Sequence, residues 1–361
     1  MGHAIPEHIY RILDLARWAP SGDNTQPWRF EILDNEHILV HGFDTRDHIV
    51  YDLDGHASQL AVGALLETLL IAASGVGRQA RISRRPDTPE THLLFDVQFE
   101  KVAHASPDSL LPYIETRVVQ RRPMSIKPLT GPQKQALADA LPPSYRVVWF
   151  EGFAKRWHLA RFMFDNAKIR LTIPEGFAVH STIIEWGAQF SEDRIPDQAV
   201  GVDPLTARLM RWVMGSDWAR VEFFNKYLLG DLPPRIQLDL LPGVACAAHF
   251  ALLTPTALQT VDDYLAAGRA MQRFWLTAAS LGLFIQPEMT PVIFTRYHRQ
   301  QRIFTQMGRT AGLARNLNAQ LADFLPGENL GALFFIGRLG TGPGPQARST
   351  RKPVASLLQH S

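Results

Sequence analysis

One helical segment, HASQLAVGALLETLLIAASGVG (56–77), constrains the fold of this chain more than any other stretch. Its spacing predicts a long helix that ends at glycines. The helix is apolar nearly all the way round, so none of its faces is suited to water. No stretch of about 18 consecutive apolar residues indicates a membrane span. We therefore expect this helix in the middle of the core of a soluble protein.

The same helix takes part in a faint internal repeat. The segments ALLETLLIAASGVG (64–77) and AMQRFWLTAASLGL (270–283) share a helix that ends in Ala-Ala-Ser and then glycine, and a β-like segment follows each. A match this short arises either by chance or from duplication. If it comes from duplication, the chain is a tandem of two similar halves with a two-fold-like cleft between them.

Strand and helix patterns alternate along the rest of the chain. Period-two runs bounded by turn residues predict strands at residues 28–33, 37–43, 80–84, 92–100, 145–152, 245–254 and 331–340. Helical spacing predicts helices at residues 7–18, 110–122, 130–141 and 261–282. Residues 153–240 have a different texture, because they consist of helical pieces rich in aromatic side chains.

The length and the charge balance limit the classes of function. A chain of 361 residues can form two domains or one large domain with an ample core. The 37 basic and 35 acidic residues give a net charge of +2, which offers no electrostatic reason to expect a nucleic-acid or membrane partner. The single cysteine, Cys246, excludes an internal disulfide and fits a reducing compartment. No apolar leader is visible at the N-terminus, so we expect a cytoplasmic location.

The turn APSGDNTQPW contains unusually many hydrogen-bonding groups. Ser21, Asn24 and Gln26 are presented on one bend between a predicted helix and a predicted strand. Serine and asparagine in turns often bond only their own backbone, which would make the bend plain structure. The Gln-Pro-Trp that leads directly into the strand is an uncommon addition and favours a binding role.

Two arginine-rich motifs suit an anion. RVVQRRP places Arg117 and Arg121 four residues apart, so they share a face of the predicted helix. The tail motif ARSTRKP adds Arg348 and Arg351. Guanidinium groups bind phosphate in a bidentate manner. Either motif alone is typical of a solvated basic face, but together they would cage a phosphate if the fold brings the tail back.

Other chemistries lack a motif. GTGPGP (340–345) follows a strand, but Pro343 and Pro345 prevent the helix that a phosphate loop needs, so we expect a turn. The 13 histidines show no HExxH or paired metal spacing, and no GxSxG elbow offers a serine nucleophile. We expect no metal ligands and no catalytic side chain.

The turn APSGDNTQPWRF closely resembles the flavin-contacting turn of the nitroreductase superfamily, and RVVQRRP resembles a variant of its phosphate-binding helix. Three longer stretches, at 52–74, 268–291 and 338–354, resemble the Acg-like subgroup, in which two nitroreductase-like halves are fused in one chain. The resemblance covers most of the chain and is weakest across 153–240.

This resemblance implies an α+β fold, with a central, mostly antiparallel sheet wrapped by helices. The first half would cover residues 1–108 and the second residues 109–361, with a helical lid inserted at about 153–240. The halves would form an intrachain pseudo-dimer, present as a monomer or as a homodimer. One complete FMN site would be retained across them.

The resemblance also implies roles for individual residues. The turn would contact the isoalloxazine ring or the ribityl chain through Ser21, Gly22, Asn24 and Gln26, and the phosphate would be bound by Arg117, Arg348 and Arg351. Arg121 would stabilise the anionic reduced ring. In the loop after the second long helix, which contains Gln286, Pro287 and Glu288, a backbone N–H would bond flavin N5. Because Val118 and Val119 replace the family's hydroxyl residue, one phosphate hydrogen bond is lost or is supplied by Ser349.

The function implied is that of an FMN-dependent oxidoreductase. NAD(P)H would reduce FMN by hydride transfer, and an electron-poor acceptor such as a nitroaromatic or a quinone would take the electrons. Two alternatives remain open: a flavin store or sensor without NAD(P)H turnover, and an oxidoreductase for one dedicated biosynthetic intermediate. The aromatic residues of the lid either stack over the ring or simply pack a helical subdomain. They are Trp186, Phe190, Trp212, Trp218, Phe223 and Phe224.

Overall fold

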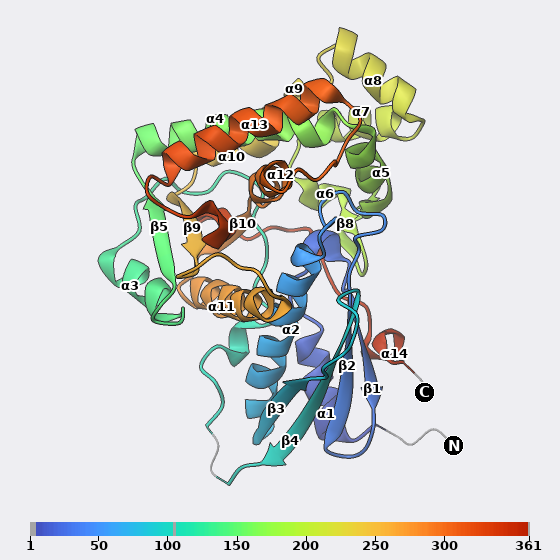
Figure 1. The fold of residues 1–361 in the computed structure, drawn as a ribbon, viewed down its shortest axis with the longest axis vertical. Coiled ribbons are helices and arrows are strands. Elements are labelled where there is room, and N and C mark those ends of the chain that lie inside the picture. The colour runs from blue at the N-terminus through green and yellow to red at the C-terminus, as the bar shows by residue number, and fades with distance from the viewer. Residues whose placement is uncertain (1–4, 104–105, 360–361) are drawn as a thin grey trace.

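The computed structural model describes residues 5–103 and 106–359 and has an α+β fold (Figure 1). Its longer strands form two four-stranded antiparallel sheets, and its short strands form two parallel two-stranded pairs, where one central sheet was expected. The first sheet lies in the lower part of the view in Figure 1, and the second lies above it beneath a layer of helices.

The first sheet is built from residues 28–101. Its strand order is β1-β2-β4-β3, and α1 and α2 pack on one face. The elements are α1 (Glu7–Ala16), β1 (Trp28–Ile32), β2 (His37–Phe43), α2 (His56–Ser74), β3 (Arg78–Arg84) and β4 (His92–Lys101). Each of these was predicted at nearly these bounds, because its apolar residues follow the period of the element and turn residues flank it.

The second sheet repeats this connectivity. Its elements are α3 (Gly131–Asp139), β5 (Arg146–Phe150), β9 (Ala248–Leu253), α11 (Val261–Ser280), β10 (Phe284–Pro287) and β11 (Leu333–Gly340). Its strand order is β5-β9-β11-β10 when it starts from its first strand. In both sheets two neighbouring strands are followed by a long helix and then by an edge strand. The last strand lies between this edge strand and the second strand of the sheet. This agreement is compatible with two similar halves.

The two long helices cross with their backbones in contact. A Cβ atom on Gly63 of α2 would lie 2.2 Å from the Leu265 carbonyl oxygen, and one on Gly268 of α11 would lie 2.2 Å from the Leu60 carbonyl oxygen. The contact is reciprocal, since each helix supplies a leucine and a glycine three residues later. It relates α2 to α11 as a two-fold axis would.

Helix α2 lies in the core, as its composition predicted. It is the one helix of the described chain with the length and hydropathy of a membrane span, and 83% of that window is buried inside the protein. Its side chains join those of α1 and of the first sheet on one side and α11 on the other. A helix that is apolar all round is therefore enclosed by protein all round.

The segment at 153–240 is largely helical, and its helices lie in different parts of the molecule (Figure 1). Its first helix, α4 (Phe153–Leu171), packs in the second core with α12 (Thr290–Arg299) and α13 (Gly308–Phe324). The helices α7 and α8 project from the top of the molecule (Figure 1). The other elements are α5 (Pro174–Ile183), β6 (Ile184–Glu185), β7 (Phe190–Ser191), β8 (Ile195–Pro196), α6 (Asp197–Val200), α7 (Pro204–Met214), α8 (Trp218–Tyr227), α9 (Leu232–Arg235), a π-helical turn (Ile236–Leu240) and α10 (Leu241–Val244).

Most of the lid aromatics pack against one another or face solvent. Trp212 and Phe224 form an edge-to-face pair on α7 and α8, and Phe223 packs on Tyr227. Phe190, Trp212 and Phe223 each keep more than half of their surface exposed. The simpler of the two expectations, aromatics that build a helical subdomain, describes these side chains.

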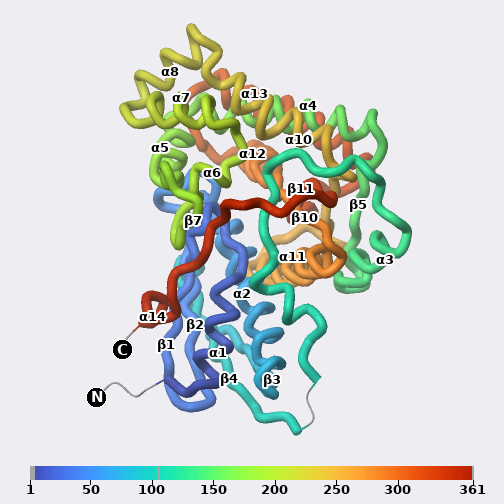
Figure 2. Tube along the Cα trace, turned by 180° about the vertical axis from the view of Figure 1, so that it is seen from behind, coloured from blue at the N-terminus to red at the C-terminus, as the bar shows by residue number. Residues whose placement is uncertain are grey.

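Two segments cross between the halves. The tail runs from β11 past the lid to the first sheet (Figure 2), where Leu358 forms a parallel bridge with Phe30. Residues 117–121 run extended beside β10, where Val119 bridges Ile285. The remaining short elements are 3-10 turns at Gly22–Asn24, Leu111–Tyr113 and Leu330–Ala332, the strand β12 (Arg348–Ser349) and α14 (Val354–Leu357).

The helix predicted at 110–122 is wrong beyond residue 113. Two adjacent β-branched residues, Val118 and Val119, favour an extended backbone, and the open edge of β10 offers Val119 a partner. Arg117 and Arg121 still share a face, because positions four apart lie on one side of an extended chain as well. In the extended chain the backbone positions of Arg117 and Arg121 are about 13 Å apart, whereas in a helix they would be separated by about one turn.

Candidate functional site

The turn from Ser21 to Gln26 concentrates unusual backbone conformations. Asp23, Asn24 and Gln26 have φ angles of 50°, 61° and 48°. Each such conformation in a residue other than glycine costs on the order of 1 kcal/mol or more, and surrounding structure must hold it in place. The Ser21 hydroxyl accepts a hydrogen bond from the Gln26 backbone N–H at 3.0 Å and closes the bend. Strain of this kind gathers at ligand sites and makes the turn a candidate.

Two other segments hold the side-chain amides of the turn. The Asn24 amide donates to the carbonyl oxygen of Glu192 at 3.1 Å, and the Gln26 amide donates to the same oxygen at 2.8 Å. The Gln26 side-chain oxygen accepts from the Lys352 backbone N–H in the tail. We call residues 189–194 the strap, because they run over the turn and pair with β12. Gly22 is exposed, and a Cβ there would meet nothing within 4 Å.

Three of the predicted arginines meet on the other side of the turn, around Trp18. The Arg117 guanidinium donates to the Trp18 carbonyl oxygen at 2.9 Å, and Arg351 donates to the Ala19 carbonyl oxygen at 3.1 Å. Arg348 lies over the Trp18 ring, 4.8 Å from its centroid. The fold therefore brings the tail back to the first motif, and we call these three arginines the arginine cluster.

In the part of the chain that the structure describes, the arginine cluster has no ion-paired acid, although the charge of Glu115 partly opposes the burial that lowers the pKa of Arg348. Within residues 5–103 and 106–359, none of its members forms an ion pair, and the Nε atoms of Arg117 and Arg348 are buried without a hydrogen-bond partner. Burial, and then the nearby Arg348, lower the pKa of Arg117 to about 9. Burial, followed by Arg117 and Arg348, lowers the pKa of Arg351 well below its usual range. Buried cations without counter-ions are costly, and an anion bound among them would reverse these shifts.

Paired charges surround the opposite side of the turn. Burial raises the pKa of the Asp23 carboxyl, and Arg121 and Arg170 oppose that rise. Arg170 in turn donates to the Asp239 carboxylate at 2.8 Å. Asp23, Arg121, Arg170 and Asp239 all keep part of their surface accessible. This side of the turn is a charge-balanced polar environment, unlike the arginine cluster.

A neutral tyrosine–histidine pair borders the same region. The Tyr51 hydroxyl and His180 Nε2 are hydrogen bonded at 2.9 Å. Burial, and then the nearby Arg170, lower the pKa of His180 to about 3, and burial raises the pKa of Tyr51. Both side chains are therefore uncharged at neutral pH and can share or pass one proton.

Residues 286–288 were expected to form an open loop that contacts the flavin. Glu288 lies instead in a buried network of ion pairs. The Glu288 carboxylate accepts from Arg338 at 2.6 Å and from His249 Nδ1 at 2.8 Å. Its backbone N–H already donates to the Ile336 carbonyl oxygen, and Pro287 has no N–H. The backbone donation to flavin N5 expected of Pro287 and Glu288 therefore does not stand.

This network reaches the site through Arg121. The Arg338 guanidinium donates to the Arg121 carbonyl oxygen at 3.0 Å, and the Arg121 guanidinium donates to the Ala199 carbonyl oxygen at 3.1 Å. Gln286 lies on β10 opposite Arg338, with its side-chain amide bonded to the Pro287 carbonyl oxygen. The network thus fixes the backbone that carries Arg121.

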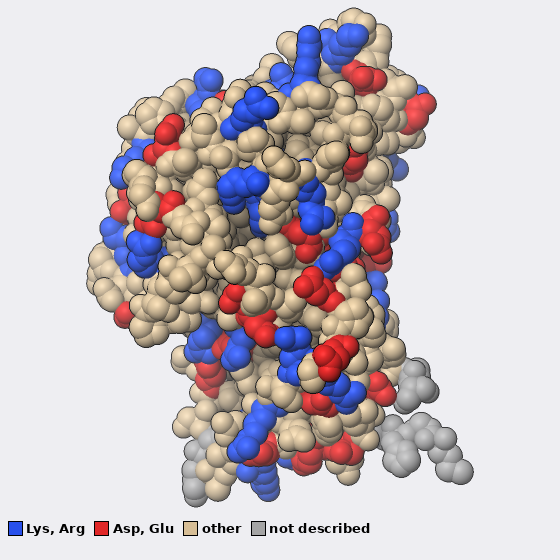
Figure 3. Space-filling model, viewed as in Figure 1, with Lys and Arg blue, Asp and Glu red and all other residues tan. Residues whose placement is uncertain are grey.

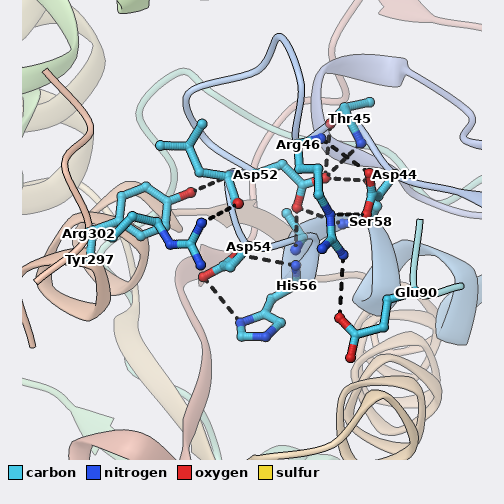
Figure 4. Close-up of polar contacts among 12 residues, drawn as sticks. Asp44, Thr45, Arg46, Asp52, Asp54, His56, Ser58, Glu90, Tyr297 and Arg302 are labelled. Carbon is cyan, nitrogen blue, oxygen red and sulfur yellow. Dashed lines mark hydrogen bonds and ion pairs between the residues drawn. The ribbon is translucent and has the colours of Figure 1, made fainter. Parts of the chain in front are cut away.

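A second network fixes the loop before α2 (Figure 4). The Asp52 carboxylate accepts from the hydroxyls of Thr45 at 2.9 Å and Ser58 at 2.6 Å. Asp54 forms a two-point ion pair with Arg296 of the second half. Burial alone would raise the pKa of Asp54, but hydrogen bonding from His56 and the charge of Arg296 hold it below its usual range. This loop joins α2 to the second half.

Several of these residues escaped sequence reasoning. Trp18 directly precedes the turn and Asp23 lies inside it, so both were available as neighbours of the motif. Arg170 and Asp239 lie in the aromatic insertion, where no motif signals them. His249 carries no signal either, since a lone histidine in a buried strand is ordinary.

Known proteins match parts of this chain. The model described as "Nitroreductase family" matches residues 6–62, which include the turn. An "Uncharacterized protein" of Mycobacterium tuberculosis is 36% identical over 95 residues, 26% of this chain and 28% of that protein. A protein of the same organism named "Putative NAD(P)H nitroreductase" is 30% identical over 126 residues, 35% of this chain and 36% of that protein. The chain thus matches about a third of the length of these relatives.

A solved structure is also similar. The crystal structure of a nitroreductase-like family protein from Bacillus cereus has 13% sequence identity and a TM-score of 0.35, and the match covers 72% of this chain and 99% of that one. A score that low carries no conclusion about the fold. The chain is therefore similar to the nitroreductase family over residues 6–62, which contain the turn, and to the named relative over 126 residues.

Proposed function

We propose that this protein is an FMN-dependent NAD(P)H oxidoreductase of the nitroreductase type. The observation that carries the proposal is the arginine cluster, in which Arg117, Arg348 and Arg351 are gathered beside the turn of the family-matching segment without an ion pair to any carboxylate of the described residues. Three guanidinium groups with two unpartnered Nε atoms suit the terminal phosphate of FMN, which would supply the counter-charge that the protein does not.

The residues of the turn and its surroundings fit the rest of the cofactor in outline. Ser21, Gly22, Asn24 and Gln26 would contact the ribityl chain or the ring, from a turn that shares its backbone with the arginine cluster through Trp18 and Ala19. Arg121 would lie toward the pyrimidine end, since an extended chain separates it from Arg117 by about 13 Å. Bound FMN would supply the redox chemistry, taking electrons from NAD(P)H and passing them to an electron-poor acceptor such as a nitroaromatic or a quinone.

The charges around the turn would tune that chemistry. Arg121 would stabilise negative charge on the reduced ring. The Glu288–Arg338 pair would hold the Arg121 backbone in place, because Arg338 donates to the Arg121 carbonyl oxygen. The neutral Tyr51–His180 pair would be able to hydrogen-bond a reduced acceptor without bringing a charge into the site. The protein would act in the cytoplasm as a monomeric pseudo-dimer or as a homodimer.

One observation favours a second candidate, a flavin-binding store or sensor without NAD(P)H turnover. The strap contacts both side-chain amides of the turn, and the Ser349 hydroxyl donates to the carbonyl oxygen of Arg194 at 2.8 Å. If these contacts persist around bound FMN, nicotinamide access is blocked. Ser349 then serves the strap rather than the phosphate.

The test is a visible absorption spectrum of the purified protein before and after incubation with FMN, followed by NADPH or NADH under nitrogen. Flavin bands that bleach with a nicotinamide support the oxidoreductase. Bands that only dithionite bleaches support the store or sensor. Arg351→Gln should abolish retention of FMN, whereas Arg81→Gln, which changes an exposed arginine on β3, should not. A wild-type protein that retains no flavin after incubation refutes both candidates.

A further inference from the structure

A second basic site lies away from the turn, where α12 ends and α13 begins. A cavity of about 510 Å³ is formed by residues 297–315. This volume is in the range of small-molecule sites, which run from about 300 to 1,000 Å³. None of its lining residues belongs to the turn, to the strap or to the arginine cluster. In the space-filling view, basic side chains gather beside a hollow in the upper half of the face, in the region of α12 (Figure 3).

The charged residues that line the cavity are all basic. They are Arg299, Arg302 and Arg315, with His298 beside them, and no aspartate or glutamate lines it. Among the ion pairs of residues 5–103 and 106–359, none includes any of these four side chains. Arg296, one turn earlier on α12, shows the contrast, because Asp54 neutralises it.

Neutral groups only partly satisfy these arginines. Arg299 donates to Asn318 Oδ1 at 2.9 Å, to Thr295 Oγ1 at 3.3 Å and to the Leu330 carbonyl oxygen. Burial, followed by the charge of Arg296, lowers its pKa. Arg302 donates to the Leu53 carbonyl oxygen at 2.8 Å. An arginine carries five N–H donors, so most of the donor capacity around the cavity remains available to a ligand.

The start of α13 adds positive potential to the same place. This helix has 17 residues and begins after Met307 without a side-chain cap, and Ala311 of its first turns lines the cavity. The Thr310 and Ala311 N–H groups already donate to the Met307 carbonyl oxygen, so the helix contributes the positive end of its dipole rather than free N–H donors. Three guanidinium groups and a helix N-terminus together match a dianionic phosphate better than a single carboxylate.

The remaining lining is mixed, with Gln301 and Thr305 among its polar residues and Ile303 and Phe304 among its apolar ones. Phe304 is buried and Ile303 is 75% exposed, so one wall of the cavity offers an aliphatic and an aromatic surface. The cavity is many times larger than the roughly 30 Å³ that one water molecule occupies. A small inorganic ion would therefore fill only part of it and leave this wall without a contact.

We propose that this cavity binds a small phosphorylated organic molecule, in which Arg299, Arg302 and Arg315 hold the phosphate and the wall formed by Ile303 and Phe304 contacts an apolar or flat part. The site is separate from the proposed flavin site. Because Arg302 bonds the Leu53 carbonyl oxygen, an occupied cavity would also contact the loop that joins α2 to the second half.

The test uses adenosine monophosphate, inorganic phosphate and adenosine as probes, each titrated into the full-length protein by calorimetry. We expect adenosine monophosphate to bind more tightly than inorganic phosphate, and adenosine to show no comparable binding. Arg315→Gln and Arg302→Gln should each weaken adenosine monophosphate binding about tenfold, as loss of a charge-assisted hydrogen bond does. Arg309→Gln is the matched control, since it removes the same charge from α13 outside the cavity lining.

The arginine cluster is the obvious competing location. Arg351→Gln changes that cluster and should leave this binding unchanged. The proposal is overturned if the wild-type protein shows no saturable binding of adenosine monophosphate, or if Arg351→Gln abolishes binding while Arg315→Gln does not. Arg315 is exposed, so its replacement should leave the fold intact and decides the matter even if Arg302→Gln unfolds.

Discussion

Replacing Arg117 by methionine should stabilise the flavin-free protein. The pKa of Arg117 is lowered from 12.5 to about 9, which corresponds to about 4–5 kcal/mol against the charged form, since a tenfold change in proton affinity is worth about 1.4 kcal/mol. The hydrogen bond to the Trp18 carbonyl oxygen and the contact 4.6 Å from the Trp275 ring return about 1 kcal/mol each. Methionine keeps the apolar packing, so we expect a gain of about 1–3 kcal/mol.

Urea unfolding of flavin-free protein in phosphate-free buffer measures this difference, with Arg81→Met on the exposed face of β3 as the control. The pKa of Arg117 also sets the direction in which the stability difference changes with pH. Because the folded-state pKa of Arg117 lies below the unfolded-state value, the buried charge destabilises the fold below pH 9, and this penalty fades as pH rises from about 9 toward 12.5. The advantage of the variant should therefore shrink between pH 8 and about pH 10.

Added FMN should reverse the order of stabilities. A ligand at 100 times its dissociation constant stabilises a protein by about 2.7 kcal/mol, and the wild-type protein should gain this while Arg117→Met gains much less. The reasoning is refuted if the flavin-free variant loses more than about 2 kcal/mol relative to the wild type, since that result would mean that the Arg117 charge is already balanced in the fold.

Two further changes test the interior. Glu288→Gln leaves His249 and Arg338 buried without their carboxylate, and urea unfolding should show a loss of about 3–5 kcal/mol. Burial lowers the pKa of His249, but the Glu288 charge outweighs burial and raises this pKa to about 10. The stability difference from the wild type should therefore be largest below pH 6.5 and shrink toward pH 10, and a difference that does not change with pH would contradict this pairing. Gly63→Ala forces a Cβ against the Leu265 carbonyl oxygen and should lower stability by about 1–3 kcal/mol or more. Gly312→Ala, in the open interior of α13, should be neutral or slightly stabilising, and equal losses in the two variants would rule out the close crossing as the cause.

Local pattern predicted the elements whose side chains follow one period. The helix at 56–74 and the strands of both sheets were recovered because their apolar positions repeat and glycines or turn residues bound them. The turn at residues 21–26 was recovered because its residue types are unusual in that order. These features are written in neighbouring residues, which is the range over which periodicity and turn chemistry act.

Features that depend on distant partners were not recovered. The segment around Val119 is extended because β10 offers an edge, and no local pattern reports that edge. The role of Glu288 was missed because its partners, His249 and Arg338, come from two other strands. The strap over Asn24 comes from residue 192, inside a segment whose pattern is helical. The meeting of Arg117 with the tail was expected only through the resemblance to a family.

The crossing of α2 and α11 has a consequence for how this chain is made. Thr68 and Gln272, which bond at 2.9 Å between the two helices, are 204 residues apart in sequence. At a synthesis rate of about 5–20 residues per second, α2 exists for roughly 10–40 s before its partner leaves the ribosome. During that interval the face of this mostly apolar helix that later packs on α11 has no cover. Co-translational folding of this protein should therefore depend on a chaperone that binds the nascent N-terminal part. Nascent chains whose synthesis is stalled before α11 should be found bound to that chaperone.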